Sequence, residues 1–165
     1  MKLSGPWVIC LGLVLLGCAK PSSGASDELP ANAYFAKGDT VGQLFHQCSR
    51  QAPEFSATSY APTAGDVISL ERRLPQALAA ALTTKFGNTE HVTFDPARYA
   101  RHYAAYEANG RAMIYGNFVP RDEEVESRVG RGALSIVCDG GPVFFGVEYD
   151  VGRQEITRIS FNGAI

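Results

Sequence analysis

The sequence predicts an α+β domain in which two N-terminal helices pack on a C-terminal antiparallel sheet, a meander of about four to five strands. Leucines recur at every fourth residue from Leu70 to Leu82, which is the spacing of one apolar face of a helix. After residue 90 the apolar pattern changes to period two, and short turns that contain glycine interrupt it. Helices before residue 90 and strands after it give this fold class.

The first helix is predicted over residues 40–50. It opens with Thr40-x-x-Gln43, a capping-box pattern, and apolar residues then follow at helical spacing. That spacing places Cys48 on the inward face, where a disulfide would be buried, and His46 on the wetter side. Pro53 ends the helix, and residues 51–65 are expected to form a loop.

The second helix is predicted over residues 66–86, with Asp66 as its N-cap and the leucine stripe extending to Phe86. Gly87-Asn88 is a fitting end for it. Pro75 lacks a backbone donor and crowds the preceding turn, so we expect a kink or a restart there.

The strands begin with a hairpin. Asn109-Gly110 favours a type I′ turn, in which both central residues need a positive φ, between strands at 101–107 and 111–119. An alternative reads Asp95-Pro96 as the start of a helix through Tyr106; we favour a strand for the second half of residues 96–106.

The remaining segments complete the sheet. Residues 121–131 are rich in charge and are expected to form a solvated connection. Three β-rich segments follow at 133–138, 143–149 and 154–161, and the short turns between them predict an antiparallel meander.

The N-terminus has the three parts of an export signal. Lys2 supplies a weak positive start, and residues 7–16 form an apolar run that is too short to remain as a membrane-spanning helix. The run ends in Leu15-Leu16-Gly17-Cys18, which resembles the lipobox of bacterial lipoproteins, although Leu16 stands where Ala, Ser or Thr is commoner. The resemblance covers only the export signal. It implies that a lipid is attached to the thiol of Cys18 and that the chain is cut before Cys18.

The chain then divides into three parts. We expect residues 1–17 to be the lipoprotein signal peptide, residues 18–33 to be the lipidated Cys18 with a flexible tether, and residues 34–165 to form a single α+β domain. Ala19 is not acidic, which in lipoproteins of this kind usually goes with transport to the outer membrane. The resemblance therefore implies a location in the cell envelope, facing the periplasm, with the lipid on Cys18 as the contact with the membrane.

The four cysteines take separate roles. The resemblance implies that Cys10 leaves with the signal peptide and that Cys18 takes the lipid. Cys48 and Cys138 remain in an oxidising compartment, so we expect them to form a disulfide. A nucleophile pair of His46 and Cys48 is the alternative, but residues two apart point to different faces of a helix. A metal site would need more ligands than these two cysteines provide.

The composition and motifs predict no catalytic, cofactor-binding or metal-binding residue. The net charge is −2 and no basic cluster is present, which disfavours nucleic acid as a partner. Gly140-Gly141-Pro142 falls in a predicted hairpin rather than between a strand and a helix, so it is no phosphate loop, and neither a G-x-S-x-G nor an HExxH motif occurs.

Two groups of residues are weaker candidates. Asp139, Glu148 and Asp150 could pair as carboxylates or bind a cation, but Asp and Gly favour turns for local backbone reasons, so a structural role is the better hypothesis. A set of aromatic residues could line a sugar- or peptide-binding groove, but these residues more simply form the core of the sheet: Tyr99, Tyr103, Tyr106, Tyr115, Phe118, Phe144, Phe145 and Tyr149.

Segments 66–78, 109–119, 136–150 and 159–163 resemble small proteobacterial proteins that have no assigned activity. That resemblance implies one folded module from about residue 60 to residue 165 and no catalytic residue.

Three functions remain as expectations. The leading one is a lipid-anchored, non-enzymatic binding or accessory module that contacts an envelope protein or a cell-wall polymer. The second is an envelope hydrolase that uses His102 or His91 with Asp139 or Glu148, and it requires these side chains to converge. The third is an immunity or inhibitor lipoprotein.

Overall fold

A computed structural model of the chain describes residues 28–54, 60–87, 94–130 and 133–163. The signal peptide, Cys18, most of the expected tether and His91 lie outside the described residues. The predictions made for them are therefore kept as predictions.

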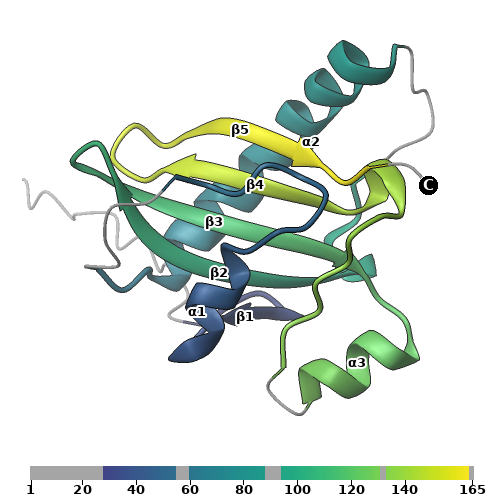
Figure 1. Ribbon diagram of the computed structural model, residues 1–165. Coiled ribbons are helices and arrows are strands. Elements are labelled where there is room, and N and C mark those ends of the chain that lie inside the picture. The colour runs from purple at the N-terminus through teal and green to yellow at the C-terminus, as the bar shows by residue number, and fades with distance from the viewer. Residues whose placement is uncertain (1–27, 55–59, 88–93, 131–132, 164–165) are drawn as a thin grey trace, which may run out of the picture.

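A five-stranded mixed sheet forms the centre of the fold (Figure 1). In spatial order its strands are β1 (Ala33–Phe35), β2 (Tyr99–Ala108), β3 (Arg111–Pro120), β4 (Phe145–Asp150) and β5 (Glu155–Phe161). The α+β class is confirmed, and β2 to β5 form an antiparallel meander. The all-antiparallel prediction is wrong for β1, which pairs parallel with β2. The chain between these two strands is a long crossover, as a parallel pair requires.

The predicted turn of the β2–β3 hairpin is confirmed, and the structure decides between helix and strand for residues 96–106. Asn109 and Gly110 have φ values of 53° and 70°, as a type I′ turn requires. Residues 96–98 form a single 3₁₀ turn, capped by the side chain of Asp95, and β2 begins at Tyr99. The preference for a strand is confirmed and the helix alternative is wrong.

Residues 133–138 do not form the predicted strand. Two of their carbonyl groups accept hydrogen bonds from side-chain amides instead of from a neighbouring strand. Ser135 O accepts from Asn117 Nδ2 at 3.0 Å, and Val137 O accepts from Asn162 Nδ2. Apolar residues in a short run cannot distinguish this irregular, side-chain-bound segment from a buried strand.

The expected charged connection at 121–131 contains helix α3 (Glu123–Gly130). Asp122 Oδ1 accepts a hydrogen bond from Val125 N at 2.7 Å, which satisfies a free donor in the first turn. Val125 is buried against Ala100 and Val119 on the sheet. Val129 packs against the same cluster, so two valines and one cap dock a mostly charged segment as a helix.

Helix α2 (Ala64–Phe86) supplies the main core. Leu70, Leu74, Leu78 and Leu82 are buried against one face of the sheet, as the stripe predicts. Phe86, at the end of the stripe, is 44% exposed, and its ring packs edge-on against the core residue Phe161.

The ends of α2 differ in part from the prediction. The N-cap is Thr63, and Asp66 is its reciprocal capping-box partner rather than the cap itself. The helix does not restart at Pro75, which lies on the exposed side, where water can reach the carbonyl group left without a donor. Gly87, with a φ of 78°, ends the helix as expected.

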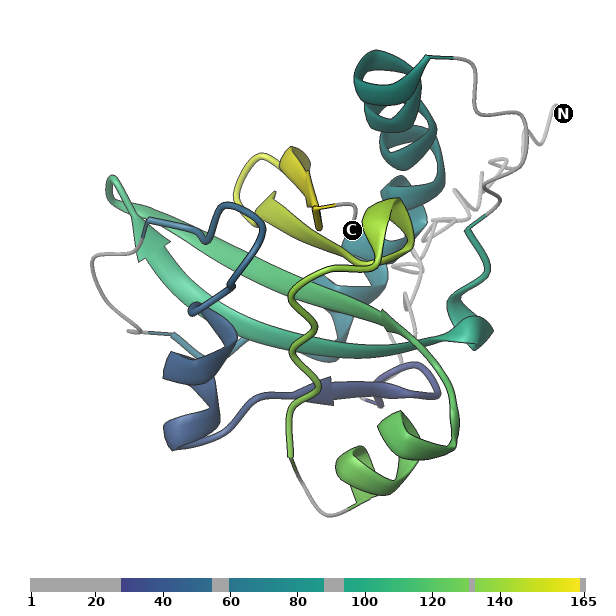
Figure 2. The ribbon, with the colours of Figure 1, turned by 45° about the vertical axis from the view of Figure 1, so that its right-hand side comes forward.

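Helix α1 (Asp39–Leu44) lies on the opposite side of the sheet from α2, together with α3 (Figures 1 and 2). The helices therefore cover both faces, not one. The predicted helix over residues 40–50 is too long, and Gly38, not Thr40, is its N-cap residue. Thr40 Oγ1 instead accepts a hydrogen bond from Lys37 N at 2.9 Å, before the helix begins. Cys48 lies beyond α1 and is exposed.

Gly146 of β4 is a position where only glycine fits. A Cβ atom built there would lie 2.8 Å from two ring atoms of Tyr115 on the neighbouring strand. We expect Gly146→Ala to lower the free energy of unfolding by about 1–3 kcal/mol, because Tyr115 has no free space to move into. Urea unfolding followed by circular dichroism measures the change. The matched control is Gly42→Ala in α1, where a Cβ meets nothing within 4 Å; equal losses in the two variants would contradict the steric argument.

Candidate functional site

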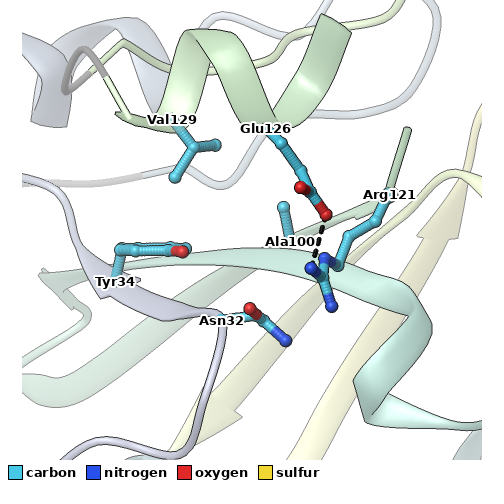
Figure 3. A pocket seen from close by; sticks show the side chains of 6 residues that line it. All are labelled: Asn32, Tyr34, Ala100, Arg121, Glu126 and Val129. Atoms are coloured by element: carbon cyan, nitrogen blue, oxygen red, sulfur yellow. Dashed lines mark hydrogen bonds and ion pairs between the residues drawn. The ribbon is translucent and has the colours of Figure 1, made fainter. Parts of the chain in front are cut away.

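A groove opens between α3 and the edge of the sheet at β1, and we call it the α3 groove (Figure 3). Its volume is about 220 Å³. Its lining side chains come from three regions of the chain: Asn32, Tyr34, Ala100, Arg121, Glu126 and Val129. In Figure 3, Tyr34 and Asn32 lie on one side, Val129 and Glu126 lie on α3 on the other, and Ala100 lies between them.

The polar wall of the α3 groove is an ion pair. Arg121 Nη2 pairs with Glu126 Oε1. The other terminal nitrogen of Arg121 donates to Ala97 O at 2.9 Å, which fixes the guanidinium against the start of β2. Both side chains are partly exposed, so the pair contributes little to stability. It presents donors and acceptors to the groove without net charge.

The opposite wall depends on Tyr34 and His102, which are direct neighbours in the β1–β2 register. Their rings stack with centroids 5.4 Å apart. Tyr34 is 38% exposed, whereas His102 is 4% exposed. Burial lowers the pKa of His102 to about 4, so its imidazole is neutral at pH 7.

His102 has an unmatched polar atom. Its buried Nδ1 has no hydrogen-bond partner among the described residues. The residue lines a second hollow of about 250 Å³, which shares Tyr34 and Val129 with the α3 groove. Lys37, Thr40 and Leu134 also border this hollow. Because a buried polar group without a partner is costly, a ligand or a water molecule that reaches Nδ1 here would be stabilised.

The first strand is held in place by a buried ion pair on the other face of the sheet. Arg101 Nη1 pairs with Glu71 Oε1 at 2.7 Å, and the same oxygen accepts from Tyr103 OH at 2.6 Å. Arg101 also donates to Ala31 O, and its backbone N donates to Asn32 O at 3.0 Å. These bonds fix the segment that carries Asn32 and Tyr34, so one wall of the α3 groove is rigidly positioned.

The cysteine prediction is confirmed in part. Cys48 and Cys138 form a disulfide, with Cα atoms 5.0 Å apart and a sequence separation of 90. The expected burial is wrong, because both residues are exposed at the surface. The chain leaves α1 four residues before Cys48, so the helical spacing that pointed Cys48 inward no longer applies.

A buried polar cluster, the Arg50 cluster, lies beside the disulfide and was not predicted. Arg50 is 7% exposed and donates to three side chains, namely Tyr115 OH at 3.0 Å, Asn162 Oδ1 at 2.9 Å and Asn117 Oδ1. The two amides in turn hold the segment that carries Cys138, through the carbonyl groups of Ser135, Val137 and Asp139. Nothing in the sequence pattern near Arg50 indicates that it is buried.

The candidate catalytic residues do not converge. His102 stacks on Tyr34, and Glu148 binds Tyr106 OH at 2.8 Å and Arg158 Nε at 2.6 Å. Asp139 lies in the exposed segment next to Cys138. No hydrogen bond or ion pair joins any two of these three acids and bases in the described chain, and His91 lies outside it.

The other candidates have structural roles. Asp150 pairs with Arg111 at 3.1 Å and accepts from Arg153 N at 3.0 Å in the β4–β5 turn. The aromatic set is buried in the core except for Phe144, which is partly buried. Within the described ranges no group of three or more His, Cys, Asp or Glu side chains is placed to hold a metal ion, and no helix has the length and apolar character needed to cross a membrane.

None of the residues that line the α3 groove was predicted from the sequence as a site residue. Tyr34 and Asn32 fall at the boundary of the expected tether, and Arg121 and Glu126 fall in the expected solvated connection. A usable signal was the isolated Tyr34-Phe35 pair directly after a segment rich in Pro, Ser and Ala. Two adjacent aromatic residues do not belong in a flexible tether, and they indicated an ordered strand.

No protein-family model, curated protein or solved structure matches this chain.

Proposed function

We propose that this chain is a lipoprotein of the bacterial cell envelope, anchored by a lipid on Cys18 and facing the periplasm from the outer membrane, and that its domain is a non-enzymatic binding module. The observation that carries the proposal is the Cys48–Cys138 disulfide. It joins the two cysteines that the lipobox leaves over, and an exposed disulfide persists in an oxidising compartment.

Binding rather than catalysis is supported by the α3 groove. It combines an exposed aromatic ring with a charge-compensated ion pair, and the ring is held by stacking on the buried imidazole of His102. None of its side chains is a nucleophile held by a neighbouring base, which is what covalent catalysis needs. The separation of His102, Asp139 and Glu148 gives no support to a hydrolase.

The position of the groove suits a ligand close to the membrane. Asn32 and Tyr34 lie a few residues after Glu28, where the described chain begins. The residues between Cys18 and Glu28 can span at most about 35 Å when extended. A lipid on Cys18 therefore keeps Glu28 within about that distance of the bilayer surface, and the first residue of the α3 groove, Asn32, follows four residues later.

Replacing Cys18 tests the anchor. Cells fed an alkyne fatty acid should attach the label to the wild-type chain and to Cys10→Ala, and should leave Cys18→Ala without label, because Cys18 carries the thiol that takes the lipid. In-gel detection of the alkyne after immunoprecipitation measures this. Cys10→Ala is the matched control, since it also removes one of the two cysteines near the N-terminus. A Cys18→Ala chain that still takes the label would overturn the lipoprotein proposal.

A further inference from the structure

Tyr34 is an unusual aromatic residue in this protein. Among the Tyr and Phe side chains that the structure describes, Tyr34 and Phe86 are the exposed ones. One ring face of Tyr34 stacks on His102, and the residue lines both the α3 groove and the adjoining hollow. Because the buried imidazole of His102 holds the ring of Tyr34 in place, the free face of that ring forms a rigid apolar platform.

In the α3 groove, the polar groups beside this platform carry no net charge. Asn32 offers an amide, and the Arg121–Glu126 pair offers a planar donor beside a carboxylate. His102 and Lys37 line the adjoining hollow and not the α3 groove. The set in the α3 groove fits a ligand that is uncharged, has one apolar face and carries several hydrogen-bonding groups around its edge.

An extended peptide is disfavoured as the ligand. A peptide added to the edge of a sheet needs a row of free backbone groups, and β1 has only three residues. The N–H of Ala33, which points away from β2, already donates to Pro30 O at 3.0 Å. The edge strand beside the α3 groove is thus short and partly occupied, which is how natural sheets block strand addition.

We propose that the α3 groove binds a neutral saccharide, with one sugar ring lying on Tyr34 and its hydroxyl or acetamido groups bonded to Asn32, Arg121 and Glu126. The axial C–H groups of a pyranose form an apolar face that matches a tyrosine ring, and its hydroxyl groups lie in the plane around that face. This inference rests on the proposed function, since it names the ligand class for the same binding surface, and an N-acetylated cell-wall glycan is the polymer within reach of an envelope lipoprotein.

The Tyr34→Trp variant tests the proposal directly. The single tryptophan of the chain is Trp7, within the segment expected to be cleaved, so the variant places the mature chain's sole tryptophan in the α3 groove. Titrating chitotetraose or cellotetraose into the mature lipoprotein in detergent should shift or quench its fluorescence with saturation. Calorimetry on the wild type with the same two probes checks that the tryptophan has not created the binding.

Tyr34→Ala should weaken binding at least about tenfold, because it removes the stacking surface. Phe86→Ala, which removes the other exposed aromatic ring at the far end of α2, should bind as the wild type does. Urea unfolding of both variants shows whether they keep their fold. If Tyr34→Ala fails to fold, Arg121→Ala tests the same groove. This position is partly exposed, and the substitution should also weaken sugar binding.

Saturable binding that Tyr34→Ala or Arg121→Ala weakens, and that Phe86→Ala leaves unchanged, supports the saccharide site. No response of the wild type to either tetrasaccharide overturns it, and so does binding of a wall stem peptide in place of both sugars. The fatty-acid label tests the lipid anchor independently of sugar binding. A chain that takes the label but binds no sugar would contradict only the saccharide proposal. A chain that binds sugar but takes no label would contradict only the lipoprotein proposal.

Discussion

Replacing Arg50 by alanine should lower the free energy of unfolding by about 3–5 kcal/mol, because three buried acceptors lose their donor at once. Arg50 donates to Tyr115, Asn117 and Asn162, which lie on β3 and just after β5. The partners are buried, so water replaces the lost bonds poorly. Urea unfolding followed by circular dichroism, compared at equal ionic strength, gives the difference.

Two variants make this experiment specific. Arg73→Ala removes an arginine whose side chain bonds to Gln154 on the surface, and it should change stability by no more than about 0.5 kcal/mol. Arg50→Lys should lose most of the stability that Arg50→Ala loses, because an ammonium group cannot present the planar set of donors that the three partners use. If Arg50→Ala cost no more than Arg73→Ala, the Arg50 cluster would not be a stabilising element.

Removing the disulfide should lower the free energy of unfolding by a similar amount, but through the entropy of the unfolded chain and not through lost hydrogen bonds. The Cys48→Ala, Cys138→Ala double variant should lose about 4–5 kcal/mol of unfolding free energy in the chain-entropy model, since the bond closes a loop of about 90 residues in the unfolded chain. The same urea experiment measures this loss. A double variant is needed because a single substitution leaves a reactive thiol.

Chemical reduction of the disulfide is the control for the double variant. Cys48 and Cys138 lie at the surface, so dithiothreitol should reduce them in the folded protein without prior unfolding. The reduced wild type should then unfold at the urea concentration of the double variant, and dithiothreitol should have no effect on the double variant itself. A disulfide that resists reduction until the domain unfolds would contradict the exposed position.

The disulfide and the Arg50 cluster act on the same part of the molecule. Arg50 follows Cys48 by two residues, and the amides that it binds hold the backbone from Ser135 to Asp139, on either side of Cys138. Two irregular segments are thus fastened to one face of the sheet by a covalent bond and by buried hydrogen bonds. Their contributions should be less than additive, since residues that share partners are coupled.

The parts that the sequence predicted well are those decided by neighbours along the chain. The leucine stripe of α2 and the Asn109-Gly110 turn depend on spacing within a few residues. The pairing of Cys48 with Cys138 followed from elimination among four cysteines. The end of α1, the true N-cap of α2 and the missing strand at 133–138 were predicted wrongly, because each depends on a contact that a short window of sequence does not contain.

The candidate site belongs to the tertiary structure. Parallel pairing of β1 with β2 brings Tyr34 onto His102, which lies 68 residues later in the chain, and it places Asn32 opposite Arg121 and Glu126 across the α3 groove. The sequence by itself determined the α+β class and the cysteines available for pairing, since these follow from local pattern and composition, and the export signal stays a prediction from the same kind of pattern. Which charged and aromatic residues share a groove was decided only by long-range strand pairing, because the register of a sheet sets the neighbours of every side chain on it.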